Sequence, residues 1–255
     1  MEPEELNELD RYREEPNKGY RTDPFKKDHK GKVLLFLGDS FTFGEGLSRE
    51  DTWAYKTYRK IQHTEEPVSG FYNLGMSGTS IHDSVSKFFW YCEEYGNPDV
   101  AFFMTTEIDR DLKHTEEVNL NSFVYDSYSR LEDYCVSNNI KLYSFSWVKN
   151  VDPYSPEPKR YLFKLIDGLK VKRPLWIEQA KRQYDMYKTN LLEQFSTFYD
   201  YPKELLVARV HEFDEATANK EKSLWALDKV HPGTAFHDFY SEFIYDKYVV
   251  DNHCH

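Results

Sequence analysis

Four short apolar runs, each separated from the next by a stretch with helical periodicity, constrain the fold of this chain more than any other feature. The runs are VLLFL (33–37), FYNL (71–74), VAFFM (100–104) and KLYSFSW (141–147). Runs of this kind are typical of strands covered on both faces, and helical crossovers between them are typical of a parallel sheet. The pattern therefore predicts a three-layer α/β/α sandwich with a central parallel sheet, of the flavodoxin-like kind.

The segments between these runs carry apolar side chains at steps of three and four residues. This spacing predicts helices over about 53–61, 81–92 and 124–135. The serines and the threonine of GMSGTS (75–80) can cap the second of them. Cys92 and Cys135 fall on the apolar stripes of predicted helices, so we expect buried free thiols and no disulfide framework.

The chain divides into an N-terminal arm and one domain. Residues 1–30 carry charge and three prolines but little periodic apolar content, which predicts an extended arm without a core of its own. Residues 31–255 then form a single domain. Its alternation of strands and helices is interrupted by a predicted helical insertion at about 151–226. Within it, ELLVARVHEF (204–213) predicts a final strand. An oligomer or assembly partner would bind through the arm.

The net charge of −11 excludes several classes of partner. Acidic residues outnumber basic ones by 44 to 33 and no dense block of lysine and arginine occurs, so we expect binding neither to nucleic acid nor to an acidic membrane. No run approaches the roughly 18 apolar residues that a membrane span needs. The acidic N-terminus does not resemble a signal peptide, so we expect a soluble cytoplasmic protein or, given the arm, a component of a viral particle.

Polar motifs follow the predicted strands, where ligands of parallel sheets gather. They are GDSF (38–41), GMSG (75–78), TTEIDR (105–110) and, near the C-terminus, LDKVHPG (227–233). A serine becomes nucleophilic when a base removes its proton and a third group orients that base. Asp228 and His231 are spaced so that the carboxylate can accept from Nδ1 while Nε2 faces Ser40.

The four motifs, in this order, resemble the four blocks of the SGNH (GDSL) hydrolases. The similar segments are LFLGDSFTFGEGL, YNLGMSGTSI, PDVAFFMTTEIDRDL and LDKVHPGTAFHDFYSEFI. The resemblance implies that Ser40 is the nucleophile, His231 the general base and Asp228 its orienting partner. It also implies that the backbone N–H groups of Ser40 and Gly78 form the oxyanion hole and that no metal or cofactor takes part. The substrate it implies is a small acyl ester, commonly an acetyl group on a carbohydrate or a lipid-derived alcohol.

The third block departs from the family pattern. Glu107 stands where the family places an asparagine that donates to the oxyanion, and an ionised carboxylate cannot donate. Thr105 or Thr106 could supply a hydroxyl, Arg110 could supply a cation, or Glu107 could be protonated. The leading hypothesis is an esterase or deacylase acting through acyl-Ser40. The alternatives are an impaired SGNH-fold binding or structural protein, including a component of a viral assembly, and an acyltransferase.

The remaining histidines and the C-terminal tail do not predict a metal site. The tail DNHCH (251–255) is most simply an exposed terminus, and His63, His82 and His114 have no companions at metal-binding spacing.

Overall fold

A four-stranded parallel sheet forms the centre of the structure. The computed structural model describes residues 19–64, 67–106, 108–146, 226 and 231–253. The strands are β1 (Lys32–Leu37), β2 (Val68–Asn73), β3 (Val100–Thr105) and β4 (Lys141–Ser146), and they lie in the order β2-β1-β3-β4. All three pairings are parallel, which confirms the four predicted strands.

Aromatic side chains pack from strand to strand along one face of the sheet. Phe36 of β1 lies opposite Phe102 of β3, which lies opposite Tyr143 of β4. Their rings stack with centroid separations of 4.9 Å and 5.3 Å. Every residue of β3 is buried, because this strand has neighbours on both edges and helices on both faces.

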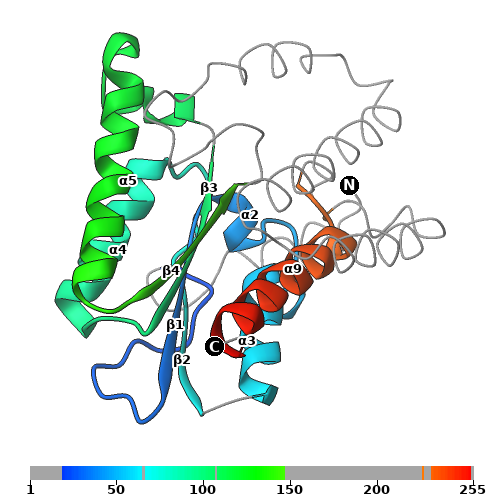
Figure 1. Cartoon of the computed structure of the whole chain (residues 1–255). Helices are drawn as coiled ribbons and strands as arrows, with labels where there is room; N and C mark the ends of the chain where they lie inside the picture. Colours follow the sequence, from blue (N-terminus) through cyan, green and yellow to red (C-terminus); the bar gives the residue numbers. More distant parts are fainter. Residues whose placement is uncertain (1–18, 65–66, 107, 147–225, 227–230, 254–255) are drawn as a thin grey trace, which may run out of the picture.

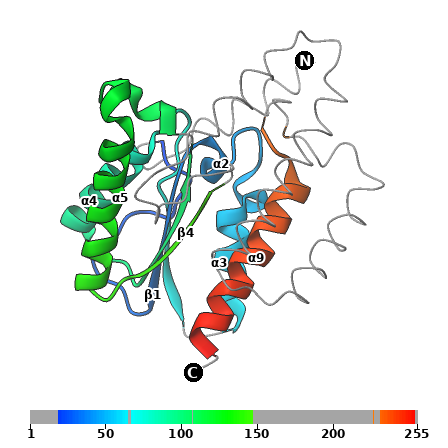
Figure 2. The same cartoon turned by 45° about the horizontal axis from the view of Figure 1, so that its top comes forward.

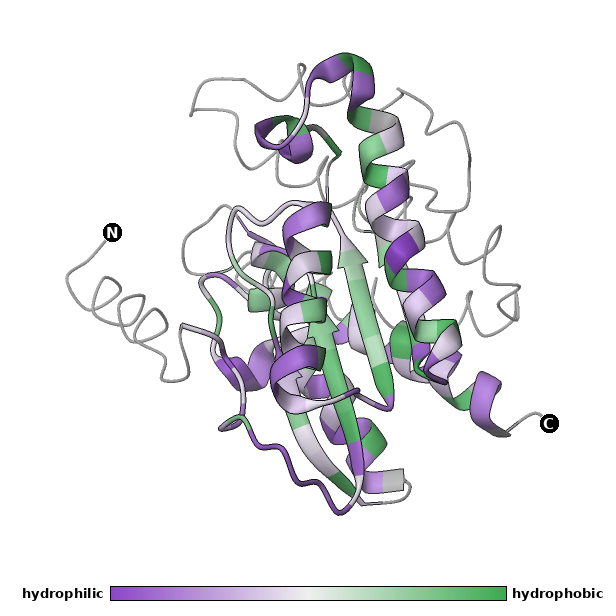
Figure 3. Ribbon diagram, turned by 90° about the vertical axis from the view of Figure 1, so that its left-hand side faces the viewer, coloured by the Kyte–Doolittle hydropathy of each residue, from purple (hydrophilic) through white to green (hydrophobic). Residues whose placement is uncertain are grey.

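Helices cover both faces of the sheet (Figures 1 and 2). On one face lie α3 (Trp53–Thr64) and α9 (Thr234–His253), and on the other α4 (Ile81–Tyr95) and α5 (Leu120–Ser137). Each pair encloses its own apolar core against the sheet. Figure 3 shows the consequence in hydropathy: the strands in the middle are largely hydrophobic, whereas the helices carry hydrophilic residues outward. The three-layer α/β/α prediction is confirmed.

Short helical turns connect these elements. They are α2 (Ser40–Phe43), η1 (Arg49–Asp51), η2 (Ile108–Lys113) and η3 (Glu117–Asn119). Helix α4 begins with the predicted cap, because Ser80 accepts the N–H of Asp83 and the Asp83 carboxylate accepts the N–H of Ser80.

Residues 19–30 pack against the outer edge of the sheet. The Thr22 hydroxyl and the Asp23 N–H both donate to the carbonyl of Phe71 in β2, at 2.8 Å and 3.1 Å. The Phe25 ring stacks on Tyr72 at 5.3 Å. The segment therefore covers an exposed strand edge, which would otherwise invite pairing with another chain. These contacts hold the described part of the arm, residues 19–30, against β2.

Several predicted features lie outside the described residues. These are arm residues 1–18, the insertion with its strand at 204–213, and three candidate or chemically reactive side chains, Glu107, Asp228 and Cys254. None of the helices in the described part of the chain has the length and apolar content needed to cross a bilayer.

Candidate active site

The order of the strands indicates where on the sheet a ligand site is expected. The chain moves outward from β1 to β2 and then returns to place β3 on the other side of β1. The helix after β1 covers one face of the sheet, whereas the helix after β2 covers the other. In open parallel sheets such a reversal leaves a ligand-binding crevice at the carboxyl ends of the two strands. The residues that follow β1 and β3 are therefore the first candidates for a ligand site.

A tight turn after β1 places Ser40 at the carboxyl end of that strand. Gly38 has φ +149°, and a Cβ on it would lie 2.2 Å from Thr42 Oγ1 and 2.8 Å from the Met104 carbonyl oxygen. Only glycine fits there. Asp39 caps α2 by accepting the Phe41 N–H at 3.0 Å, so Ser40 becomes the first residue of that helix. The exposed fraction of Ser40 is 4%.

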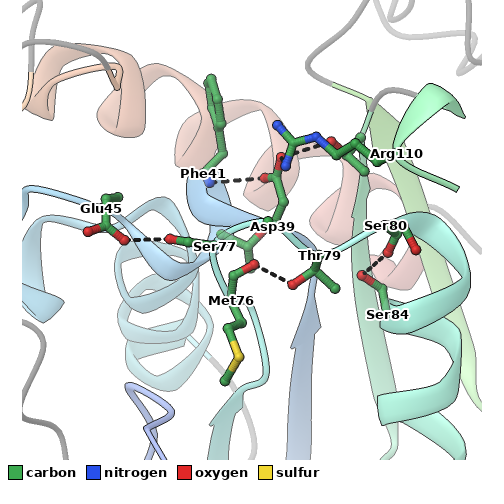
Figure 4. A network of polar contacts seen from close by, with 12 residues as sticks. Asp39, Phe41, Glu45, Met76, Ser77, Thr79, Ser80, Ser84 and Arg110 are labelled. Atoms are coloured by element: carbon green, nitrogen blue, oxygen red, sulfur yellow. Dashed lines mark hydrogen bonds and ion pairs between the residues drawn. The ribbon is translucent and has the colours of Figure 1, made fainter. Parts of the chain in front are cut away.

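The Asp39 carboxylate connects this turn to the segment after β3. Its second oxygen accepts the Thr106 hydroxyl at 2.9 Å. The same oxygen pairs with the Arg110 guanidinium at 3.3 Å, and Figure 4 shows Arg110 beside Asp39. Asp39 is completely buried. Burial raises the pKa of this carboxyl, while Arg110, the Phe41 N–H and the Thr106 hydroxyl each lower the pKa and limit that rise. With these donors, Asp39 braces the turn that carries Ser40.

The imidazole of His231 lies beside the same turn. Its ring centroid is 5.9 Å from that of Phe41, at an interplanar angle of 73°. His231 is also close enough to Asp39 to lower the pKa of that carboxyl. The His231 carbonyl accepts the Ala226 N–H at 2.9 Å, which holds the segment that leads into α9. The structure thus brings His231 next to the helix that begins with Ser40. The role of Asp228, which lies outside the described residues, stays a prediction.

Asn73 connects the loop after β2 to the turn that carries Ser40. Its side-chain Nδ2 donates to the Thr42 carbonyl at 2.8 Å, and its Oδ1 accepts the Gly75 N–H at 2.9 Å. A Cβ on Gly75 would lie 2.6 Å from the Phe43 nitrogen, so the two loops touch through backbone. Farther along the loop, the Ser77 hydroxyl donates to Glu45 at 2.5 Å (Figure 4).

Gly78 lies at the open end of this loop. It is exposed, has φ +75°, and a Cβ on it would meet no atom within 4 Å. Its carbonyl accepts from Lys113 at 3.2 Å. The buried Asp111 carboxylate accepts the N–H groups of Ile81 and His82, at 3.2 Å and 3.0 Å. Both contacts come from η2, so the third block fixes the position of the loop that carries Gly78.

The hydroxyl hydrogens of the two candidate threonines are both used within the scaffold. Thr106 donates to Asp39, as described, and Thr105 donates to the Phe145 carbonyl at 3.3 Å. A hydroxyl has one hydrogen to donate. In this arrangement neither threonine directs its hydrogen to an oxyanion. Arg110 remains beside the turn as the ion-pair partner of Asp39.

Sequence reasoning missed three polar residues that shape this site. Asn73 ends β2, a position at which a polar side chain signals a functional loop, so its role could have been inferred. Arg21, which contacts the turn after α2, and His237, whose Nδ1 accepts the Trp53 N–H at 2.9 Å, carry no such signal. Each lies in a segment whose pattern points only to surface charge or to a helix.

The cysteines and histidines of the described residues do not add a second reactive centre. Burial raises the pKa of the Cys92 and Cys135 thiols to about 12, which keeps them protonated and unreactive near neutral pH. Among the residues that the structure covers, no group of three histidine, cysteine or acidic side chains is arranged to hold a metal ion.

Solved structures similar to this chain include a lipolytic protein of the G-D-S-L family from Desulfitobacterium hafniense, at 13% identity and a TM-score of 0.46, covering 85% of this chain and 99% of that one. They also include the esterase EstA from Pseudoalteromonas, at 14% identity and a TM-score of 0.45, covering 85% and 96%. A mutant of Axe2, an acetylxylan esterase from Geobacillus stearothermophilus, matches at 17% identity and a TM-score of 0.43, covering 87% and 96%.

The first of these structures bears the name of the family that the four sequence motifs resemble. Similarity at this level assigns neither an activity nor a substrate to the chain. No protein-family model matches the sequence, and no curated protein matches it either.

Proposed function

We propose that this chain is a serine esterase of the SGNH type that hydrolyses small acyl esters, with acetyl esters of carbohydrates as the first substrate class to test. The observation that carries the proposal is the meeting of two distant segments: Ser40 begins α2 at the carboxyl end of β1, and His231 lies against Phe41 of the same helix. The acetyl and carbohydrate preferences come from the motif resemblance alone.

In the proposed reaction, Ser40 Oγ attacks the ester carbonyl while His231 accepts the hydroxyl proton. The negative charge that develops on the carbonyl oxygen is stabilised by the N–H groups of Ser40 and Gly78. His231 then donates its proton to the departing alcohol, which leaves an acyl group on Ser40. A water molecule, deprotonated by His231, attacks the acyl-enzyme. The bond between the acyl carbon and Ser40 Oγ then breaks, His231 returns the proton to Oγ, and the acid is released. Asp228 orients the imidazole throughout.

The rate of this reaction should reflect the altered third block. Loss of one oxyanion donor costs about 2.7–4 kcal/mol, or about a hundred- to a thousandfold in kcat. Both candidate threonines donate elsewhere. We therefore expect an esterase that is slow by comparison with one that has all three donors.

The same departure motivates a second candidate function, an SGNH-fold protein that binds a ligand or partner without turning it over. The carboxylate of Glu107 would repel the anion that catalysis must stabilise. The two candidate functions predict different results for Ser40→Ala. If the chain only binds, this variant and the wild type show the same background rate of ester hydrolysis.

The test is hydrolysis of p-nitrophenyl acetate and butyrate, and release of acetate from acetylated xylo-oligosaccharides. Ser40→Ala and His231→Ala should each reduce the rate to the uncatalysed background. Matched controls are Ser122→Ala, at a serine exposed on α5, and His63→Ala, at a histidine exposed on α3. Both controls should keep the wild-type rate. Equal rates for the wild type, Ser40→Ala and His231→Ala would refute the proposal.

An acyltransferase uses the same acyl-enzyme and differs only in the acceptor. The hydrolysis assay is therefore repeated with added xylose and glucose, and the products are separated by mass. Free acetate as the dominant product supports hydrolysis, whereas acetylated sugar as the dominant product assigns the chain to transfer.

A further inference from the structure

A charged side chain from the N-terminal segment lies buried against the turn that carries Ser40. Arg21, which precedes all four sequence blocks, has an exposed fraction of 1%. Its Nη1 donates to the carbonyl oxygens of Gly44 and Leu47, both at 2.6 Å, and to that of Phe43 at 3.3 Å. Its Cζ lies 4.3 Å from the centroid of the Phe43 ring. The guanidinium therefore binds three carbonyls of this turn, those of Phe43, Gly44 and Leu47, through one nitrogen.

These carbonyls belong to the turn that holds Ser40 from its C-terminal side. The N–H groups of Gly44 and Glu45 donate to the Ser40 carbonyl, at 2.8 Å and 3.0 Å. Gly44 reverses the chain with φ +78°, and the Leu47 N–H closes the turn on the Gly44 carbonyl at 3.1 Å. One set of hydrogen bonds thus runs from Arg21 to the turn, and the next from the turn to Ser40.

Thr22, the residue after Arg21, contacts the end of β2, where the loop that carries Gly78 begins. The Thr22 hydroxyl accepts the Asn73 N–H at 3.2 Å, and the Asn73 side chain binds the Thr42 carbonyl at 2.8 Å. Two consecutive residues of the N-terminal segment therefore contact the backbone that presents Ser40 and the strand end that leads to Gly78. A segment that served only to cover the sheet edge would not need a buried charge at this place, because burying a charge is costly.

We propose that Arg21 is a positioning residue for Ser40, and that the N-terminal segment is thereby a working part of the active site. The inference rests on the proposed function for its kinetic test and is independent of it for its structural test. An arginine suits the task because its guanidinium stays charged when buried and stacks on the Phe43 ring while Nη1 binds the carbonyls, whereas a lysine is a compact charge without a planar face.

The structural test is amide hydrogen exchange in the full-length chain. In Arg21→Ala, exchange at Gly44 and Glu45 should accelerate by about tenfold or more relative to exchange in β3, since the turn loses the group that binds its carbonyls. Arg49→Ala is the matched control. Arg49 lies in the same region and pairs with Asp23 of the segment at 2.5 Å. The Arg49→Ala variant should leave the ratio of exchange rates between the turn and β3 unchanged.

The kinetic test measures ester hydrolysis by the same variants, with Arg21→Lys added. Displacement of a reacting group by about 1 Å can cost about a hundredfold. We expect kcat to fall by about ten- to a hundredfold in Arg21→Ala with little change in KM, a smaller fall in Arg21→Lys, and wild-type rates in Arg49→Ala. Millimolar guanidinium chloride should restore part of the kcat of Arg21→Ala by filling the vacated site.

The two tests separate the failure of this inference from that of the proposed function. An inactive wild type contradicts the proposed function. Exchange that accelerates at Gly44 and Glu45 of Arg21→Ala, and not in β3, would still support the role of Arg21. Uniform acceleration of exchange throughout Arg21→Ala would overturn the inference. So would an active wild type whose kcat falls equally in Arg21→Ala and Arg49→Ala.

Discussion

A buried histidine caps helix α3 and should make the stability of the domain depend on pH. His237 of α9 has an exposed fraction of 2%, and its Nδ1 accepts the N–H of Trp53 at 2.9 Å. Trp53 is the first residue of α3. The first N–H groups of a helix have no partner within it. A protonated imidazole carries hydrogen on both nitrogens and cannot accept this bond, so the cap requires the neutral ring.

The magnitude follows from the displaced pKa. Burial, and then the charges of Lys56, His231 and Arg21, lower the pKa of His237 from 6.5 to about 3. The folded state therefore binds this proton less readily than the unfolded state does. The stabilisation is fully present above pH 6.5 and is lost as the pH falls toward 3. Each pH unit in this window costs about 1.4 kcal/mol, so a change from pH 7 to pH 5 removes about 2 kcal/mol.

The assay is urea unfolding of the wild type, His237→Asn and His63→Asn at pH 7 and pH 5. The side-chain oxygen of asparagine can take the place of Nδ1 and does not titrate. The loss of unfolding free energy between the two pH values should be smaller in His237→Asn by about 2 kcal/mol. The control, at a histidine exposed on α3, should keep the wild-type dependence. An identical pH dependence in His237→Asn and the wild type would refute the reasoning.

Three further predictions concern the scaffold. Asp39→Asn places an amide against the Arg110 guanidinium and should lower the unfolding free energy in urea by about 1.5–3 kcal/mol; no change would contradict the bracing role. Gly75→Ala drives a Cβ into backbone and should cost about 3 kcal/mol, whereas Gly78→Ala meets open space and should cost about 1 kcal/mol. The reverse ranking would contradict the loop packing. In a variant that keeps only Cys135, the thiol should react with Ellman's reagent after unfolding and not before, because burial raises its pKa to about 12.

The layers of the fold could be predicted because they depend on local patterns. A run such as VAFFM (100–104) is apolar throughout because β3 is buried on both faces and both edges. The N-terminal cap of α4 could also be predicted. Ser80 and Asp83 are three residues apart, and the side chain of each accepts the backbone N–H of the other. The order of the strands could not be derived in this way, because pairing between β1 and β3 depends on contacts between distant segments.

Two residues of the candidate site, Ser40 and Gly78, could be predicted from their place in the sequence. Both follow predicted strands, and ligands of parallel sheets bind at the carboxyl ends of strands. Arg21 and His237 could not be found in this way, since their roles come from tertiary contacts alone. Arg21 lies among other charged residues, and a buried arginine has the same local pattern there as a solvated one. His237 sits in an aromatic helix, where nothing in the sequence distinguishes a cap from a packed ring.

The most direct test of the account is covalent labelling of the native chain with an alkyl fluorophosphonate, followed by intact-mass and peptide mass spectrometry. A serine that is activated by a neighbouring imidazole reacts with such a reagent, whereas ordinary serines do not. The account predicts a single adduct on Ser40, its absence in Ser40→Ala, and strongly slowed formation in His231→Ala. An unlabelled wild type, or an adduct that forms equally fast without His231, would contradict it.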